Sequence, residues 1–383
     1  MLLCCAINFR HAIKSCCLAL ALLMFATSLV SAQGVSGTVV GQEDSSRDWA
    51  DRLEYVGVAV EEPGYHVWGT SPVIGPAGKT HLFVARWLIE KEFKAWLTHC
   101  EIARYVSDQP EGPFVFQEVV VAGSGEKGTW DYQSPHNPSV QKVGQRYVLT
   151  YIANAGGKKS ECVSSQRIGM MIADSPEGPW KKVVKDGPLL APPTDPTIWS
   201  FQSSVGVNNP ALLEHPDGRF FLYYKAMKKG GIRRMGVAIA DQVEGPYVFN
   251  PESLTSNKTT IEDGYAFIEN EKVFLLTTHN REGAGYLWAS DDGVDFAEPM
   301  VGFEKMDRYL NTKKIPKANV FRGKKFERPQ VLVQDGHPTH LYVAAGANVN
   351  GGKGTHSSVF RIKPSKPSKP SKGSKPAGSD SKR

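Results

Sequence analysis

The sequence predicts an all-β protein, a single five-bladed β-propeller of four-stranded antiparallel blades. The first observation is a recurring phrase, found as SDQPEGPF at 107–114, ADSPEGPW at 173–180 and ADQVEGPY at 240–247. The second is its spacing, because the glutamates of the three copies lie 66 and 67 residues apart. Repeats of this length without helical patterning are typical of propellers, in which each blade is one repeat.

Two further strands precede the phrase in each repeat. The longer of them is apolar, and its five copies occupy residues 81–85, 147–152, 220–224, 273–277 and 340–344. The shorter one comes first and opens on a polar residue or an acidic pair. The five openings are Ser71-Pro72, Asn137-Pro138, Asn209-Pro210, Glu262-Asp263 and Arg328-Pro329. Five units with this order of strands predict five blades.

The recurring phrase is itself a turn, since its Gly-Pro pair sets a bend and its aromatic residue packs on the blade. A weaker fourth copy, SDDGVDF, stands at 290–296. The glutamates Glu111, Glu177 and Glu244 belong to these turns. We therefore expect them to be structural rather than catalytic.

A signal peptide is predicted at residues 1–32. Arg10 and Lys14 precede an apolar run at 16–30, which ends in the small-residue sequence Val-Ser-Ala. The run is shorter than the roughly 20 residues of a membrane span, and a retained anchor helix is the alternative. We expect a secreted or periplasmic protein, with no transmembrane segment after cleavage, whose mature chain begins near Gln33.

The net charge of +6 belongs to the ends of the chain. Residues 363–383 repeat Lys-Pro-Ser and are expected to be a disordered tail; they hold seven basic residues against one acid and carry +6. Arg10 and Lys14 add +2, so the propeller, residues 33–362, carries −2. A nucleic-acid partner is disfavoured, because it needs positive charge on the folded surface. The tail is a solvated linker or a contact for anionic polymers.

Only Cys100 and Cys162 remain once the signal peptide is removed. A disulfide and two buried thiols are both open for them, because an exported protein permits either. Two cysteines do not supply the four ligands of a structural zinc site, and the chain has no H-E-x-x-H pair. We expect no metal and no cofactor; a structural calcium ion in the central channel is the alternative, which no motif supports.

The openings of the innermost strands form the candidate site. These strands run along the channel of a propeller, so the residues that begin them converge on one funnel, a usual setting for a ligand. The candidates at the openings are Ser71, His136, Asn137, Asn209, Glu262, Asp263, Glu327 and Arg328. Further candidates that flank the same strands are Glu101, Arg104, Lys225 and His279. Histidines at blade mouths suit hydroxyl binding or proton transfer.

The phrases of this chain resemble the glycoside hydrolase family 43 superfamily. The resemblance covers residues 68–344 and rests on ADSPEGPW, HNPSV, NNPALLEHPDGRFFLYYK, IEDGYAF and ERPQVLVQDGHPTHLYV. It implies an inverting mechanism with an aspartate base in blade one, an aspartate modulator and a glutamate acid. Glu262, which stands 13 residues before Leu275, matches the position of the acid.

Two of the three catalytic positions of the family hold no carboxylate in this chain. The base position falls near Ser71 and the modulator position at Asn209. An alternative reading of Glu327 and Arg328 is an ion pair that closes the last blade. The replacement carboxylates on the same rim are Glu327, Asp263, Glu101 and, more weakly, Asp131.

The leading hypothesis is a secreted glycoside hydrolase that acts on a terminal sugar of a poly- or oligosaccharide by an inverting acid/base mechanism. Glu262 is then the acid, and Asp263 or Glu327 is the partner carboxylate. Lys225 and Arg104 favour an anionic sugar if they face the channel, and belong to a solvated surface otherwise. The second hypothesis is a carbohydrate-binding propeller that has lost hydrolysis, and the third is a lyase or phosphorylase using the same funnel.

Overall fold

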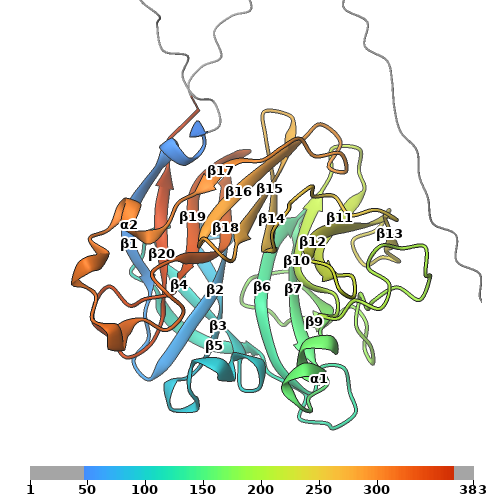
Figure 1. The fold of residues 1–383 in the computed structure, drawn as a ribbon, viewed down its shortest axis with the longest axis horizontal. Coiled ribbons are helices and arrows are strands. Elements are labelled where there is room, and N and C mark those ends of the chain that lie inside the picture. Colours follow the sequence, from blue (N-terminus) through green and yellow to red (C-terminus); the bar gives the residue numbers. More distant parts are fainter. Residues whose placement is uncertain (1–46, 366–383) are drawn as a thin grey trace, which may run out of the picture. The chain divides into compact units, whose positions relative to one another are not determined.

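Five four-stranded antiparallel sheets follow one another along the chain, as the repeat predicts (Figure 1). The computed structural model describes residues 47–365. The innermost strands are β2 (Tyr65–Ile74), β6 (Gln133–Val143), β10 (Asn208–Glu214), β14 (Ile261–Glu269) and β18 (Phe326–Gln334). They contact one another in this order, and β18 contacts β2, so that the ring is closed. The fold is therefore a five-bladed propeller, and the predicted fold class is confirmed.

Each of the first four blades runs in chain order from its innermost strand at the channel to its outermost strand. Blade one contains β2 (Tyr65–Ile74), β3 (Thr80–Leu88), β4 (Glu101–Ser107) and β5 (Val115–Val121). Blade two contains β6 (Gln133–Val143), β7 (Arg146–Asn154), β8 (Arg167–Ala173) and β9 (Lys181–Lys182). Blade three contains β10 (Asn208–Glu214), β11 (Phe220–Met227), β12 (Arg233–Ala240) and β13 (Val248–Phe249). Blade four contains β14 (Ile261–Glu269), β15 (Lys272–His279), β16 (Ala284–Ser290) and β17 (Met300–Phe303).

Blade five combines the two ends of the described chain, with β18 (Phe326–Gln334), β19 (His337–Ala345), β20 (His356–Ile362) and, outermost, β1 (Leu53–Val60). β1 pairs antiparallel with β20, so that Leu53 faces Ile362. Short helices lie in the loops: η2 (Ala50–Arg52), η3 (Ile89–Lys91), η4 (Phe93–Leu97), α1 (Lys159–Ser164), α2 (Met306–Tyr309), η5 (Thr312–Lys314) and η6 (Lys317–Asn319). β1 is thus the strand that closes the ring. The repeat pattern gives no sign of it, because β1 precedes the first repeat.

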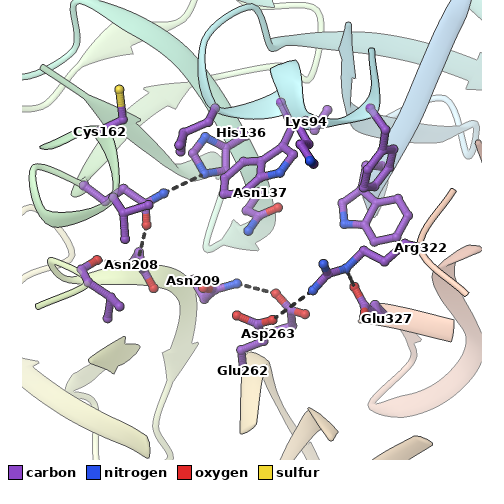
Figure 2. A pocket seen from close by; sticks show the side chains of 18 of the residues that line it. Lys94, His136, Asn137, Cys162, Asn208, Asn209, Glu262, Asp263, Arg322 and Glu327 are labelled. Atoms are coloured by element: carbon purple, nitrogen blue, oxygen red, sulfur yellow. Dashed lines mark hydrogen bonds and ion pairs between the residues drawn. The ribbon is translucent and has the colours of Figure 1, made fainter. Parts of the chain in front are cut away.

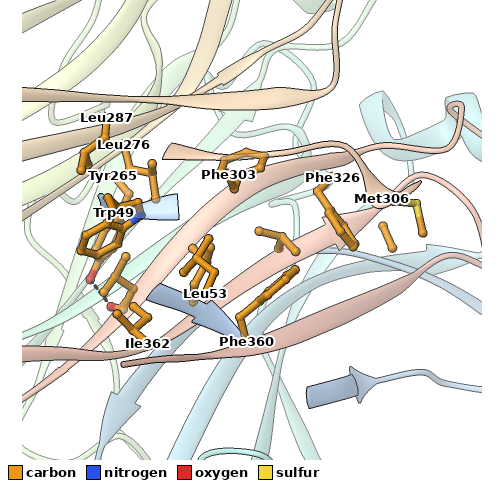
Figure 3. Packing of buried hydrophobic residues seen from close by; sticks show 14 of the residues in the cluster. Trp49, Leu53, Tyr265, Leu276, Leu287, Phe303, Met306, Phe326, Phe360 and Ile362 are labelled. Atoms are coloured by element: carbon orange, nitrogen blue, oxygen red, sulfur yellow. Dashed lines mark hydrogen bonds between the residues drawn. The ribbon is translucent and has the colours of Figure 1, made fainter. Parts of the chain in front are cut away.

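A buried apolar cluster fixes the closing strand against blades four and five. Trp49 and Leu53 pack there with Phe326, Phe360 and Ile362 (Figure 3). Burial of such large side chains away from water supplies most of the favourable free energy of folding. The ring is thus closed by both hydrogen bonds and apolar contact.

The glutamates of the recurring turns link each blade to the one before it. Glu244 Oε1 lies 2.6 Å from Arg146 Nη1 of blade two, and Glu111 Oε1 lies 2.5 Å from Arg361 Nη2 of blade five. Glu177 Oε1 lies 3.6 Å from His81 Nε2 of blade one. The three contacts repeat one interblade link, in agreement with a structural role.

Replacing Glu244 with glutamine is expected to lower the free energy of unfolding by less than about 1 kcal/mol, because an ion pair between exposed side chains contributes little. The side chains of Glu244 and Arg146 are 42% and 43% exposed. Urea denaturation of the variant measures this loss. A loss of about 3–5 kcal/mol, the size expected for a buried ion pair, would contradict this interpretation.

The described residues leave several expectations about the termini open. The predicted signal peptide at 1–32, and the predicted tail beyond residue 365, lie outside residues 47–365. Within that range no helix is long and apolar enough to cross a membrane.

Cys100 and Cys162 are both buried free thiols, and burial raises the pKa of each.

Candidate functional site

All five innermost strands carry the same β-bulge near their beginning. At each bulge the innermost strand has one residue more than the strand paired with it. The first residue of the bulge has a left-handed backbone, with φ between 49° and 65°. The left-handed residues are Gly69, Asn137, Asn209, Asp263 and Arg328. The residues just before them are Trp68, His136, Asn208, Glu262 and Glu327. Because a bulge re-aims the side chains beside it, these two sets meet at one end of the channel.

The structure corrects the predicted opening of blade one. The bulge of β2 falls on Gly69 and not on Ser71. Ser71 is fully buried, and its Oγ accepts a hydrogen bond from the backbone N–H of Val140 at 2.9 Å, so it joins two blades beneath the pocket instead of lining it. The prediction was wrong because a proline follows the left-handed residue directly in three other blades, whereas Pro72 stands three positions after Gly69.

The bulges open into a pocket of about 730 Å³ (Figure 2). Part of its lining is aromatic and comes from blade one, η4 and the loop before β18: Trp68, Trp87, Phe93, Trp96 and Phe321. Amide and charged side chains from blades two to five form much of the rest. An aromatic surface facing convergent polar groups suits a ligand that has both apolar and hydroxyl-bearing faces.

Glu262, on β14, is held by cations from blade three. Its Oε2 lies 2.7 Å from Lys225 Nζ and 2.9 Å from Arg233 Nη1, and Asn280 Nδ2 donates to its Oε1. Burial by itself raises the pKa of Glu262, but Lys225 and Arg233 outweigh it and hold the pKa well below its ordinary value. Glu262 is thus an ionised carboxylate, which does not suit the proton-donor role that the resemblance implies for it.

Asp263, the next residue, has the opposite shift. Burial and the charge of Glu262 raise its pKa to about 6, against the lowering effects of Arg328 and Lys225. Asn209 Nδ2 donates a hydrogen bond to Asp263 Oδ1, across from blade three (Figure 2). Of these two adjacent acids, Asp263 is therefore the one that carries a proton at mildly acidic pH.

Glu327 is the third carboxylate of the pocket and comes from blade five. Its Oε2 lies 2.6 Å from Arg322 Nε, and its Oε1 lies 2.8 Å from Lys325 Nζ. Both cations belong to the loop before β18. The alternative in which Glu327 pairs with Arg328 is therefore wrong, because the two neighbouring side chains turn to different partners.

Arg328 crosses the channel and reaches blade two. Its Nη2 donates to the backbone carbonyls of Asn137 and Pro138 at 2.8 and 3.1 Å, and the side chain is fully buried. Burial lowers its pKa to about 10, so the guanidinium stays charged at neutral pH. A Cβ on Gly69 would lie 3.2 Å from Arg328 Cγ. The arginine of blade five therefore occupies the space that a side chain at the blade-one bulge would need.

Replacing Gly69 with alanine is expected to lower the free energy of unfolding by about 1–3 kcal/mol, because alanine is strained in a left-handed backbone and crowds Arg328. Gly78→Ala is the matched control, since Gly78 has φ of 76° but no heavy atom within 4 Å of a Cβ. Urea denaturation compares the two variants. Equal losses would contradict the tight packing of Arg328 on Gly69.

The structure brings some of the other predicted site residues into the pocket. His136, Asn137, Asn209 and Lys225 line it. His136 Nδ1 donates to the carbonyl of Ser134 at 2.7 Å, and burial lowers the pKa of its imidazole to about 4, so the ring is neutral. A neutral imidazole in this place suits hydrogen bonding to a hydroxyl.

Three flanking candidates do not line the pocket, because strand alternation turns them towards neighbours within their blades. The contacts are Glu101 Oε1 with Arg86 Nε at 2.9 Å, Arg104 Nη2 with Glu118 Oε1 at 2.8 Å, and His279 Nε2 with Thr259 Oγ1 at 2.6 Å. Asp131 likewise pairs with Lys182 at 2.6 Å.

Sequence reasoning missed the basic residues that surround the acids, chiefly Arg233, Arg322 and Lys325. A signal for two of them was present in the run RGKK at 322–325, which stands just before the fifth opening. Arg233 gave no such signal, because it begins the third strand of its blade, and the packing of β12 against β14 brings it to Glu262.

The pocket does not fit a calcium ion. Calcium prefers six to eight oxygen ligands, whereas Glu262 and Glu327 are each engaged by two cations. Within residues 47–365 no group of three or more His, Cys, Asp or Glu side chains is placed to hold a metal ion.

Comparison with known proteins adds a family context to this geometry. No family model matches the chain. A segment of 55 residues is 36% identical to the xylosidase/arabinosidase 43A of Humicola insolens, covering 14% of this chain and 16% of that protein. A family 117 glycoside hydrolase of the marine bacterium Zobellia galactanivorans superposes with a TM-score of 0.59 and 18% identity, over 81% of this chain and 89% of its own.

A family 43 enzyme of Xanthomonas citri, solved in complex with xylotriose, superposes with a TM-score of 0.54 and 12% identity, over 84% of this chain and 93% of its own. The chain has the five-bladed fold of glycoside hydrolase families 43 and 117. At 12% and 18% identity these two likenesses show the fold alone, and the resemblance expected from the sequence is confirmed at the level of the fold. A shared fold does not fix the chemistry of the residues that stand at its bulges.

Proposed function

We propose that the protein is a glycoside hydrolase that removes a terminal sugar from a poly- or oligosaccharide. The observation that carries the proposal is the pair Glu262 and Asp263, adjacent carboxyl groups whose environments push their pKa values apart. Such separation assigns a proton donor and an anion within one site. The family 43 fold and the xylotriose bound to one of its members support an oligosaccharide as the ligand.

In this mechanism Asp263 protonates the glycosidic oxygen as the bond to the anomeric carbon breaks. Glu327 accepts a proton from the water that attacks the anomeric carbon from the opposite face. Glu262 acts on Asp263 through its negative charge, which keeps the proton on that carboxyl. The proposal reassigns the acid from Glu262 to Asp263, and inversion at the anomeric carbon follows from the family resemblance.

The aromatic lining supports the binding of a sugar ring, since flat aromatic faces pack against the apolar face of a pyranose. His136, Asn137 and Asn208 offer polar groups to hydroxyls from blades two and three. The pocket is lined by residues of all five blades and is therefore expected to surround the end of a sugar chain. These features favour a terminal sugar over an internal one.

The experiment is an incubation of the purified protein with a panel of neutral and acidic oligosaccharides, with sugar release followed by chromatography and the first anomer formed followed by NMR. Release of a monosaccharide with inverted configuration is expected. Retention would assign the second carboxylate the role of nucleophile. Binding without any release would contradict hydrolysis.

A carbohydrate-binding propeller without hydrolysis is the second candidate. One observation favours it: the bulge of blade one carries Gly69, so this opening supplies no carboxylate to the pocket, and Arg328 packs against it. The proposal also includes export of the protein, which rests on the signal peptide predicted at residues 1–32. N-terminal sequencing of the exported protein is expected to start near Gln33.

A further inference from the structure

The pocket carries an excess of positive charge that the proposed hydrolysis does not use. Its lining includes three carboxyl groups and six cationic side chains, the latter being Lys94, Lys159, Lys225, Arg233, Arg322 and Lys325. The sequence of the propeller, residues 33–362, has a net charge of −2. The positive charge is therefore local to the pocket, in a protein body that is otherwise slightly acidic.

The excess arises because two carboxylates are each shared by two cations. Glu262 lies within 2.9 Å of both Lys225 and Arg233. Glu327 lies within 2.8 Å of both Arg322 and Lys325. Each group of three charges keeps one positive charge uncompensated. A partly buried cation without a counterion is costly, and an anionic ligand would offset that cost.

Arg233 and Arg322 are the cations best placed to meet a ligand. Their side chains are 33% and 40% exposed, whereas that of Lys225 is only 8% exposed. Among the contacts of residues 47–365, Arg233 binds Glu262 through Nη1, and Arg322 binds Glu327 through Nε. Each guanidinium therefore retains terminal N–H groups for a planar or tetrahedral oxyanion.

The two arginines converge on the carboxyl groups from different blades. Arg233 begins β12 of blade three, and Arg322 belongs to the loop before β18 of blade five. Arg322 Nη2 approaches Glu262 to 3.8 Å (Figure 2). Arg233 Nη1 lies 2.9 Å from the same side chain, so both guanidinium groups border one carboxylate. A sugar that presents its glycosidic oxygen to Asp263 would bring a substituent on its ring to these arginines.

We propose that the sugar bound in this pocket carries a carboxylate or sulfate group, which Arg233 and Arg322 hold. This inference deepens the proposed function and rests on the pocket being a glycan site. The structural relative in complex with xylotriose shows that the fold accommodates a neutral oligosaccharide. The anionic preference would thus be a property of this chain's own arginines and not of the fold.

The test compares chemically matched ligands. Oligogalacturonides are paired with their carboxyl-reduced forms, and sulfated carrageenan oligosaccharides with their desulfated forms, with Kd and sugar release measured for each. The wild type is expected to prefer the anionic member of at least one pair by roughly tenfold or more, as charge-assisted hydrogen bonds imply. The pair that shows the preference distinguishes a carboxylate from a sulfate. The preference should shrink as NaCl is raised.

The variants Arg233→Gln and Arg322→Gln are expected to bring the anionic-to-neutral ratio of affinities towards one. Arg219→Gln is the matched control, because it also removes one positive charge but pairs with Asp217 outside the pocket. The control should keep the wild-type ratio. If a pocket variant fails to fold, inorganic sulfate is expected to compete with the preferred sugar for the wild type, and the absence of competition would overturn an oxyanion site in the pocket.

The outcomes separate this inference from the proposed function. Equal affinity or equal turnover for the members of every pair overturns the anionic preference and leaves a neutral-sugar hydrolase standing. Failure to bind or cleave any sugar of these pairs or of the wider panel overturns the proposed function, and the anionic preference with it. Release from neutral sugars of the panel, with no binding of either anionic member, overturns the anionic preference alone. A ratio that also collapses in Arg219→Gln would assign the preference to overall charge and not to the pocket.

Discussion

Replacing Asp263 with asparagine is expected to lower kcat for sugar release by about 10²–10⁴-fold, the usual contribution of a general acid. Asparagine has the same shape and tolerates the left-handed backbone at this position, where φ is 62°. The propeller should therefore stay folded while the proton donor is lost. Measured kcat values, together with far-UV circular dichroism of the variant, check this expectation.

The pH dependence of the wild type provides the second readout for Asp263. Its pKa of about 6 means that activity should fall as pH rises through about 6, because the acid loses its proton. The asparagine variant should lack this limb in its residual activity. A wild-type profile that stays flat up to pH 8 would contradict Asp263 as the acid.

The same shift has a consequence for stability. The folded chain holds a proton on Asp263 between its ordinary pKa of 3.8 and its raised pKa of about 6, whereas the unfolded chain has released it. The free energy of unfolding that Asp263 contributes therefore falls as pH rises through this window. Urea denaturation across this pH range should show that the free energy of unfolding of the wild type falls, relative to that of Asp263→Asn, as pH rises.

Replacing Glu262 with glutamine is expected to lower the free energy of unfolding by about 3–5 kcal/mol, because removing one partner of a buried ion pair leaves a buried charge uncompensated. Lys225 is the charge at issue, since its side chain is 8% exposed and its Nζ lies 2.7 Å from Glu262 Oε2. Urea denaturation measures the loss. The activity limb assigned to Asp263 should also move below pH 6, because the charge of Glu262 no longer raises that pKa.

The control for Glu262 is the double variant Glu262→Gln, Lys225→Met. Removing the orphaned cation together with its partner should restore most of the lost stability, as a double-mutant cycle would show. Glu244→Gln serves as the exposed comparison, with its expected loss below about 1 kcal/mol. A loss as small as that for Glu262→Gln would contradict the buried pairing with Lys225.

Much of the fold followed from local sequence signals. The Gly-Pro turns and the apolar strands before them repeat at one period, so the number and order of the blades are encoded within each repeat. The closing strand β1 (Leu53–Val60) was not foreseen, because it pairs with β20 at the far end of the chain. The blade-one opening was misplaced because in three other blades a proline directly follows the first bulge residue, whereas Pro72 lies beyond the bulge of β2.

The sequence identified the acids of the candidate site by their position at the start of inner strands, but not their roles. Glu262, Asp263 and Glu327 were identified because they begin inner strands, and all three line the pocket. Their roles were not readable, because a role depends on the groups opposite. Ser71 was chosen on the same argument, but it lies buried outside the pocket. A shift of one residue along a strand turns a side chain to the opposite face of the sheet.

The sequence by itself determined that this chain is a five-bladed propeller whose acids stand at the mouths of the fourth and fifth blades. Only the tertiary structure decided which of those acids holds a proton. Glu262 and Asp263 are neighbours in sequence, yet their pKa values move in opposite directions. The reason is that Coulombic interactions act through space: blade three presents Lys225 and Arg233 to Glu262, while burial and the Glu262 charge keep the proton on Asp263.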